Sequence, residues 1–298
     1  MEDLDSLYTS ENLDDIKRFY QMFKNREELV TWMKNRPTAK IETVVIKGES
    51  ENVAAVIPTA NPHNERVKNL IKSLHRYLII LSVSSGKYFN FARSVNEGVM
   101  RALELDAKWI IISNDDVVIK SKFSLGKLPD DVYSIFIYGK GEPNVVCKFN
   151  FLIHFLKVMD RQKYSVFRKF RINYFTTLKS PLSSAICRKM YEVKNVKFVG
   201  PFFIVNSCFV KNNGNKLFDP VYINGVEDFD FLTTVLKKGK IITIKADVEH
   251  LGGASLQNTS ARVWRNYANY AYFNYKIEHN ELVVPKLKLD GSKELEEI

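Results

Sequence analysis

The sequence predicts an α/β protein whose mixed, mostly parallel sheet is flanked by helices. Three observations predict this class. Short apolar runs alternate with amphipathic helical patterns between residues 53 and 119. The runs are apolar throughout, as expected for strands covered on both faces. The 298 residues are 45% hydrophobic, enough for a sizeable core. Parallel strands joined by helical crossovers account for this alternation.

Residues 1–50 precede the alternation and are predicted to be helical. One apolar stripe recurs at helical spacing in the first part: Leu13, Ile16, Phe19, Tyr20 and Phe23. A second stripe follows a polar NREE stretch: Leu29, Trp32 and Met33. We therefore expect an amino-terminal helical extension over 1–50 that packs on the main domain.

Two strand and helix pairs follow. Residues 53–57 form an apolar run that ends in a turn at 58–62, PTANP, and a helical pattern comes next. The second run, 77–83, is broken by Ser84, Ser85 and Gly86. Another helical pattern then leads to the third strand, with apolar positions Ala92, Val95, Val99, Ala102 and Leu103. Three strands within about 65 residues favour right-handed crossovers.

The third strand carries the first candidate site. Its run WIII, residues 109–112, stops at Ser113, Asn114, Asp115 and Asp116. Ligands of open α/β sheets bind beyond the carboxyl ends of the strands, and carboxylates there are suited to a metal ion and the phosphates it bridges. An acidic turn is the alternative, because Asn and Asp are ordinary turn residues.

A strand over 132–138 precedes a basic segment at 148–197. Twelve Lys and Arg stand there against two acidic residues, so this segment carries the excess of the +10 formal charge. Aromatic residues interleave with the charges, and a helix is predicted over 145–159. Three hypotheses stay open: stacking on single-stranded nucleic acid, contact with an anionic membrane surface, or a helical insertion with aromatic core residues.

Several classes are excluded or disfavoured by missing signals. The first strand is followed by neither a GxGxxG nor a GxxxxGK[ST] sequence, which disfavours dinucleotide and P-loop sites. Cys147, Cys187 and Cys208 are too widely spaced for a zinc site or a disulfide framework. The acidic amino terminus is unlike a signal peptide, and no apolar run is long enough to cross a bilayer. We expect a cytoplasmic protein, with peripheral contact at the inner face of the membrane left open.

The last candidate residues lie between 222 and 255. Glu227, Asp228 and Asp230 crowd the start of a predicted helix, which ends in Lys-Lys-Gly, and a strand follows at 241–244. Acids in a first turn also complement the helix dipole, so capping alone is an alternative. His250 precedes Gly252 and Gly253; it is either a site residue or an ordinary polar loop residue.

The order of these features resembles the family 2 glycosyltransferases, which have the GT-A fold. The stretches that carry the resemblance are AVIPTAN, FARSVNEG, NDDV, GVEDFDF and VEHLGGAS. The resemblance implies a GT-A domain over 51–280 that contains the 148–197 insertion and a C-terminal aromatic helix at 256–280, followed by a tail at 281–298. Packing on the domain is the expected role of that aromatic helix, with membrane contact or dimer formation as alternatives.

The resemblance also implies residue roles. Asp116 and His250 would hold Mn²⁺ or Mg²⁺, and mixed O/N ligands suit manganese better. Asp228 would be the general base, with Glu227 orienting the acceptor or the base. The implied nucleotide-sugar-binding residues are Pro58, Thr59, Asn61, Ser84, Arg93, Asn96, Asn114 and Asp115.

The activity so implied is inverting sugar transfer from a nucleotide sugar to a hydroxyl of a glycan, lipid-linked or protein acceptor. One departure concerns the donor: the stretch LSVSSGK lacks the acid that reads the base in the family, so the donor stays open. Two other functions are retained as alternatives. One is a degenerate GT-A domain that binds nucleic acid or anionic membrane, and the other is a nucleotidyltransferase. The oligomeric state is not predicted.

Overall fold

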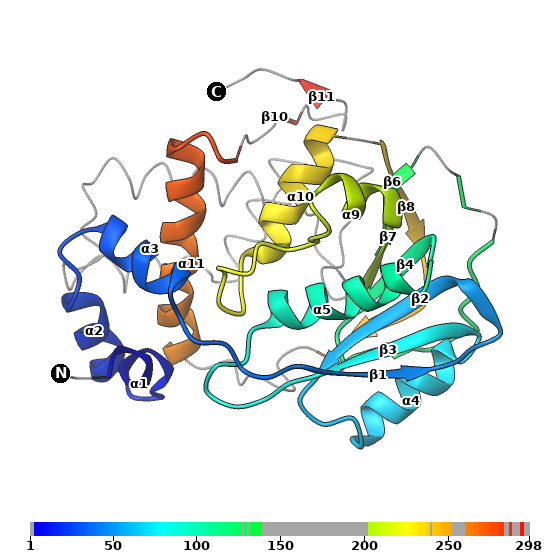
Figure 1. Ribbon diagram of the computed structural model, residues 1–298, viewed down its shortest axis with the longest axis horizontal. Helices are drawn as coiled ribbons and strands as arrows, with labels where there is room; N and C mark the ends of the chain where they lie inside the picture. The colour runs from blue at the N-terminus through cyan, green and yellow to red at the C-terminus, as the bar shows by residue number, and fades with distance from the viewer. Residues whose placement is uncertain are drawn as a thin grey trace. The chain divides into compact units, whose positions relative to one another are not determined.

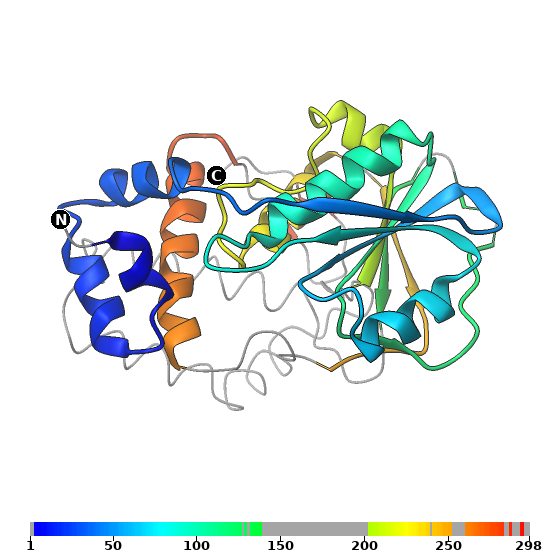
Figure 2. The ribbon, with the colours of Figure 1, turned by 60° about the horizontal axis from the view of Figure 1, so that its bottom comes forward.

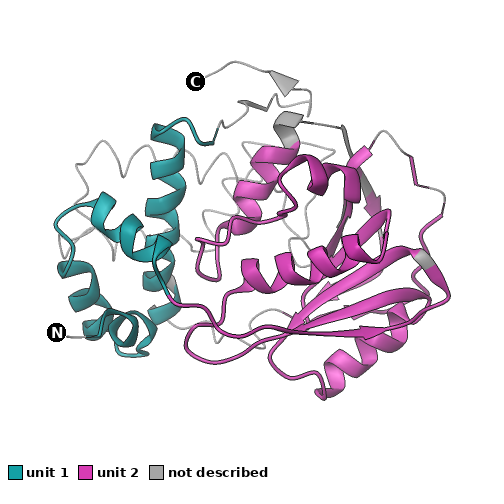
Figure 3. Cartoon of the chain, viewed as in Figure 1, with its two compact units in different colours: residues 1–36, 143–196, 256–298 teal, residues 37–142, 197–255 magenta. Residues whose placement is uncertain are grey.

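The computed structural model describes residues 3–126, 128–129, 132–138, 202–238, 240–251, 260–282, 286–287 and 293–294. The chain divides into two compact units (Figure 3). Unit 1 comprises Met1–Arg36, Pro143–Val196 and Leu256–Ile298, and unit 2 comprises Pro37–Glu142 and Lys197–Ser255. The basic segment 148–197 and the helix predicted at 145–159 lie outside the described residues, as do Gly252, Gly253 and Ser255.

A seven-stranded sheet forms the centre of unit 2, in the order β1-β3-β2-β4-β7-β6-β8 (Figure 1). Its strands are β1 (Glu42–Ile46), β2 (Ser50–Thr59), β3 (Tyr77–Val83), β4 (Trp109–Ser113), β6 (Val132–Tyr138), β7 (Phe202–Asn206) and β8 (Lys240–Lys245). Strand β2 is parallel to β3 and β4, and β6 is parallel to β8. Only β1 and β7 pair antiparallel to their neighbours. The predicted mixed, mostly parallel sheet is confirmed.

Helices α4 (Glu65–Leu74) and α5 (Phe91–Glu104) cover opposite faces of this sheet (Figure 2). On one face, Val67, Leu70 and Leu74 of α4 belong to the same buried cluster as Ala55, Ile57 and Ile111 of the strands. On the other face, α5 approaches β2 and β3 closely at Gly98. A Cβ there would lie 2.4 Å from Val56 Cγ1 and 2.5 Å from Ser82 Oγ. Strands covered in this way have no solvated face, which explains their continuous apolar runs.

The amino-terminal region departs from the prediction. Helices α1 (Leu4–Thr9), α2 (Leu13–Gln21) and α3 (Arg26–Lys34) are present, but Glu42–Ile46 is strand β1 at the edge of the sheet. The helical prediction for 1–50 is therefore wrong after Lys34, because residues 35–41 are not helical and Glu42–Ile46 is a strand. Strand β1 pairs on one side only, with β3, and its residues are exposed or half-buried, so it lacks the apolar alternation that marks a strand.

In unit 1, the three amino-terminal helices pack together and against α11 (Ser260–Glu278). The buried Tyr20 hydroxyl donates to the Trp264 carbonyl at 2.7 Å and accepts from the Ala268 N–H at 3.0 Å. Burial raises the pKa of Tyr20 well above its usual value, so the phenol stays neutral and able to donate. The tail contributes two paired two-residue strands, β10 (Lys286–Leu287) and β11 (Lys293–Glu294). Among the described helices, none is long and apolar enough to span a bilayer.

Candidate active site

The first part of the candidate site lies where two parallel neighbours end. Strand β2 ends at Thr59, and Asp115 follows β4 by two residues. The Thr59 hydroxyl donates to Asp115 Oδ2 at 2.8 Å. Because the carboxyl ends of parallel strands meet at one edge of a sheet, residues 56 positions apart come into contact. Thr59 is buried, so this hydrogen bond holds the Asp115 carboxylate at the strand ends.

A small two-stranded sheet adds Asp116 and His250 to this edge. Strand β5 (Val117–Ile119) pairs antiparallel with β9 (Val248–His250), and Val117 lies opposite His250. The Leu251 N–H donates to the Asp116 carbonyl at 3.1 Å and extends this pairing. His250 Nε2 lies 3.0 Å from Asp116 Oδ1, with the Asp116 side chain 8% exposed and that of His250 26% exposed. The strand pairing therefore holds a carboxylate and an imidazole together.

A charged pair also links the two sides of this small sheet. Lys120 Nζ lies 2.5 Å from Glu249 Oε2, and the Lys120 N–H donates to the Asp247 carbonyl at 2.8 Å. The hydrogen bond with Glu249 raises the pKa of Lys120 above its usual value. Both side chains are exposed, so this ion pair contributes little to the stability of the small sheet.

The remaining residues predicted at these strand ends occupy different environments. Ser84 follows β3, is buried, and donates its N–H to the Thr59 carbonyl at 3.0 Å; within the described part of the chain its hydroxyl has no partner. Pro58 is buried within β2. Asn61 lies in the exposed turn, where its side chain accepts the His63 N–H at 3.0 Å. The half-buried Asn114 accepts the Ser113 hydroxyl through its carbonyl at 3.0 Å.

The second part of the candidate site is the first turn of α10 (Glu227–Lys238). Glu227 and Asp230 are 7% and 6% exposed, whereas Asp228 is half-buried and accepts the N–H of Phe229 at 3.0 Å. The buried Tyr222 hydroxyl donates to Asp230 Oδ2 at 2.9 Å. Asp230 therefore takes part in an internal contact, and Asp228 is the most accessible acid of the three.

Tyr222→Phe is expected to lower the free energy of unfolding by about 1–3 kcal/mol, because a buried carboxylate loses a donated hydrogen bond. Chemical denaturation of the two proteins would measure the difference. Tyr133→Phe is the matched control, because it removes the hydroxyl of a half-buried tyrosine on β6 whose ring packs against Phe209. Equal losses for the two variants would contradict a specific contribution of the Tyr222 hydroxyl.

Arg93 and Asn96, predicted to bind the nucleotide sugar, lie on α5 and contact the connection between α9 (Ser207–Asn212) and α10. Arg93 Nε donates to the Pro220 carbonyl at 3.3 Å. The Asn96 amide donates to the Phe218 carbonyl at 2.7 Å and accepts the N–H groups of Leu217 and Phe218, each at 3.0 Å. The structure thus divides the predicted residues into one group at the strand ends and another around α5 and α10.

Sequence reasoning missed Tyr222, Asn90 and Asn224, which also contact this connection. Asn90 alone carried a signal, as a polar residue directly before an apolar helical pattern, which is typical of an N-cap. Tyr222 and Asn224 lie in the irregular stretch VYING, where no periodicity indicates which side chains turn inward.

No known protein family matches this sequence, and no curated protein is significantly similar to it. Among solved structures, the chain is similar to the catalytic domain of Drosophila β1,4-galactosyltransferase 7 in complex with xylobiose. The identity is 14% and the TM-score 0.40, over 79% of this chain and 85% of that chain. A similarity at this level assigns neither family nor activity, so the function has to be inferred from the residues themselves.

Proposed function

We propose that this protein is an inverting glycosyltransferase of the GT-A type, which transfers a sugar from a nucleotide-sugar donor to a hydroxyl acceptor. The single observation that carries the proposal is the meeting of Asp116 and His250 at 3.0 Å. These residues come from the two motifs in which the resemblance implies metal ligands, far apart in the sequence. Their neighbour Asp115 is held by Thr59 at the end of β2, where an α/β sheet binds its ligands.

The proposed ligand atoms fit a divalent cation that accepts both oxygen and nitrogen ligands. Asp116 would supply a carboxylate oxygen and His250 an imidazole nitrogen, a combination that suits Mn²⁺ better than Mg²⁺. No group of three metal-binding side chains occurs within the ranges that the structure describes. The donor diphosphate and water would complete the coordination. When bound, such an ion neutralises the charge that develops on a diphosphate leaving group.

The remaining chemistry is assigned to the first turn of α10. The Asp228 carboxylate accepts the proton of the acceptor hydroxyl as that oxygen forms its bond to the anomeric carbon. The bond between that carbon and the diphosphate oxygen breaks on the opposite face, so the anomeric configuration inverts and the nucleoside diphosphate leaves. Glu227 orients the acceptor or the base. Thr59, Ser84, Asn114 and Asp115 would line the donor site, in which the buried Ser84 hydroxyl is able to donate or accept a hydrogen bond.

The experiment that tests this function measures release of nucleoside diphosphate from a panel of UDP-, GDP- and dTDP-sugars in the presence of Mn²⁺. Release above background from one of them, increased by an oligosaccharide or lipid-linked acceptor, would support transfer. Absence of release from every donor, together with salt-sensitive binding to oligonucleotides or anionic vesicles, would favour a binding protein instead.

Asp116→Asn and His250→Ala are each expected to weaken Mn²⁺ binding by at least about tenfold, because changes in the second shell alone reduce metal affinity by 10- to 100-fold. Titration calorimetry with Mn²⁺, in the presence and absence of UDP, measures this affinity directly and does not require turnover.

Glu249→Gln is the matched control for the metal prediction. This carboxylate lies on β9 beside His250 but pairs with Lys120, so its replacement should leave Mn²⁺ affinity unchanged. If Asp116→Asn and His250→Ala bind Mn²⁺ as tightly as the original protein, these two residues are not the ligands.

A further inference from the structure

Residues 217–226 of the connection between α9 and α10, which runs from 213 to 226, are held by side-chain amides at several points. From α5, Asn96 uses both ends of its amide on this segment, with one donated and two accepted hydrogen bonds to the backbone of Leu217 and Phe218. An amide suits this place because it donates and accepts at once, whereas an ionised carboxylate only accepts. The start of the connection is thereby fixed to α5.

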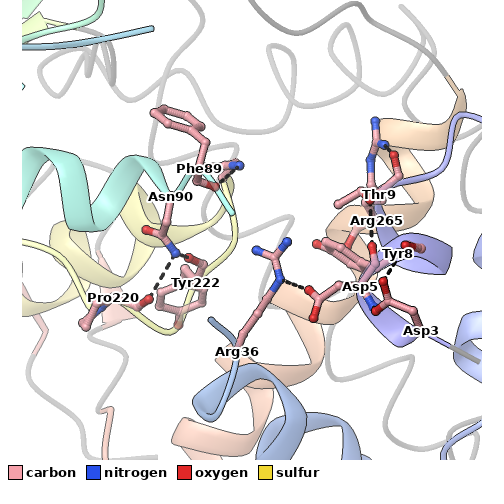
Figure 4. Close-up of polar contacts among 12 residues, drawn as sticks. Asp3, Asp5, Tyr8, Thr9, Arg36, Phe89, Asn90, Pro220, Tyr222 and Arg265 are labelled. Atoms are coloured by element: carbon pink, nitrogen blue, oxygen red, sulfur yellow. Dashed lines mark hydrogen bonds and ion pairs between the residues drawn. The ribbon is translucent and has the colours of Figure 1, made fainter. Parts of the chain in front are cut away.

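Asn90 and Asn224 hold the later part of the connection. The Asn90 amide nitrogen donates to the carbonyls of Pro220 and Tyr222 at 3.2 and 2.7 Å (Figure 4). The same side chain accepts the Arg93 N–H at 2.9 Å and so caps α5. In the opposite direction, Asn224 accepts the Phe91 N–H at 2.8 Å and donates to the Phe89 carbonyl at 3.2 Å. Hydrogen bonds in both directions therefore join the amino terminus of α5 to the connection.

The connection ends in a strained backbone directly before the two proposed catalytic acids. Asn224 has φ of 54° and Val226 has φ of 74°. Asparagine tolerates this region, but a β-branched residue there is an outlier. The Val226 carbonyl accepts the N–H groups of Phe229 and Asp230, so this strained residue sets the direction in which α10 starts. Such strain persists only where the surrounding contacts over-determine the conformation.

We propose that Asn90, Asn96 and Asn224 are positioning residues that hold the 217–226 connection in its strained form and thereby place Glu227 and Asp228 for catalysis. This inference rests on the proposed function for its catalytic part. It assigns Asn96 a role through the carboxylates of α10, in place of a direct contact with the donor. It also brings in Asn224, a residue that the family resemblance does not implicate.

The test uses the full chain with Asn96→Ala, Asn96→Asp and Asn224→Gly, with Asn213→Ala as the control. Asn224→Gly keeps a residue that accepts positive φ and removes only the side-chain contacts. Asn96→Asp keeps the two accepted hydrogen bonds and loses the donated one. Asn213 also donates from its amide to a backbone carbonyl, that of Lys216 at 3.0 Å, but both residues precede the 217–226 segment.

Hydrogen exchange and steady-state kinetics provide separate readouts. Asn96→Ala and Asn224→Gly should speed exchange of the 217–230 peptides by about tenfold, with β2, β3 and β4 unchanged, because local contacts are lost without global unfolding. They should lower kcat by about 10- to 100-fold, with the donor KM within about twofold, as expected for misplaced catalytic groups. The exchange rate and the kcat of Asn96→Asp should lie between those of Asn96→Ala and those of the unsubstituted protein. Both quantities should be unchanged in Asn213→Ala.

Four outcomes would overturn the inference: faster exchange with unchanged kcat, exchange raised equally in the central strands, a rise in donor KM alone, or no change in exchange. If the unsubstituted protein transfers sugar from none of the donors, the proposed function is refuted instead. In that case, faster hydrogen exchange in the variants that is confined to residues 217–230 would still support the positioning contacts. Unchanged exchange in the variants would still refute them.

Discussion

Asp228→Asn is expected to lower kcat by about 10²- to 10⁴-fold, which is the usual contribution of a positioned general base. Asparagine has nearly the same shape and its oxygen can still accept the Phe229 N–H, but it cannot take the proton of the acceptor hydroxyl. The measurement is the initial rate of transfer at saturating donor and acceptor. Mn²⁺ affinity should be unchanged, because the proposed metal ligands are Asp116, directly before β5, and His250, at the end of β9.

Asp106→Asn is the matched control for Asp228→Asn. Asp106 lies two residues after the end of α5 and has φ of 57°, a conformation that asparagine also tolerates. Its replacement should leave kcat within about twofold, as for a surface change away from the site. If the two variants transfer sugar equally well, the base is another residue.

Asp5→Ala is expected to lower the free energy of unfolding by about 3–5 kcal/mol, the effect of removing one partner of a buried ion pair. Arg36 Nε lies 2.6 Å from Asp5 Oδ1, and the two side chains are only 4% and 11% exposed (Figure 4). The guanidinium also lies over the rings of Tyr8 and Trp32, at 5.5 and 5.8 Å from their centroids. Without Asp5, this enclosed cation loses its nearest opposite charge.

Denaturant unfolding followed by tryptophan fluorescence would measure the effect, because Trp32 lies beside Arg36. Asp14→Ala is the control in the same unit. Asp14 pairs with Lys17 at 2.7 Å, but its side chain is 78% exposed, so the loss should stay within about 1 kcal/mol. Losses of the same size in both variants would contradict a special contribution of the buried pair.

The sequence predicted the features that depend on local patterns. Continuous apolar runs identified β2, β3 and β4, since strands buried on both faces cannot alternate with polar residues. The same reasoning missed β1, which lies at an edge where partial exposure removes the pattern. Asp116 and His250 were paired by motif order, and the structure places them in contact.

The roles around α5 and α10 were less accessible from the sequence. Asn96 was predicted at the donor site, yet its described hydrogen bonds go to Leu217 and Phe218. The contacts of Asn224 depend on a loop with irregular dihedrals, which neither composition nor periodicity specifies. The packing of the first three helices on α11 joins the two ends of the chain and likewise has no local signal.

By itself, then, the sequence determined the class of fold, the order of the central strands β2, β3 and β4 and of the helices between them, and the residue types available for chemistry at strand ends. These follow from hydrogen-bond periodicity and from burial, which act over a few residues. Only the tertiary structure decided which other distant side chains meet: Thr59 with Asp115, and Asn90 and Asn96 with the connection before Glu227. Such contacts depend on how strands pair and how loops close, which is a property of the whole packed unit.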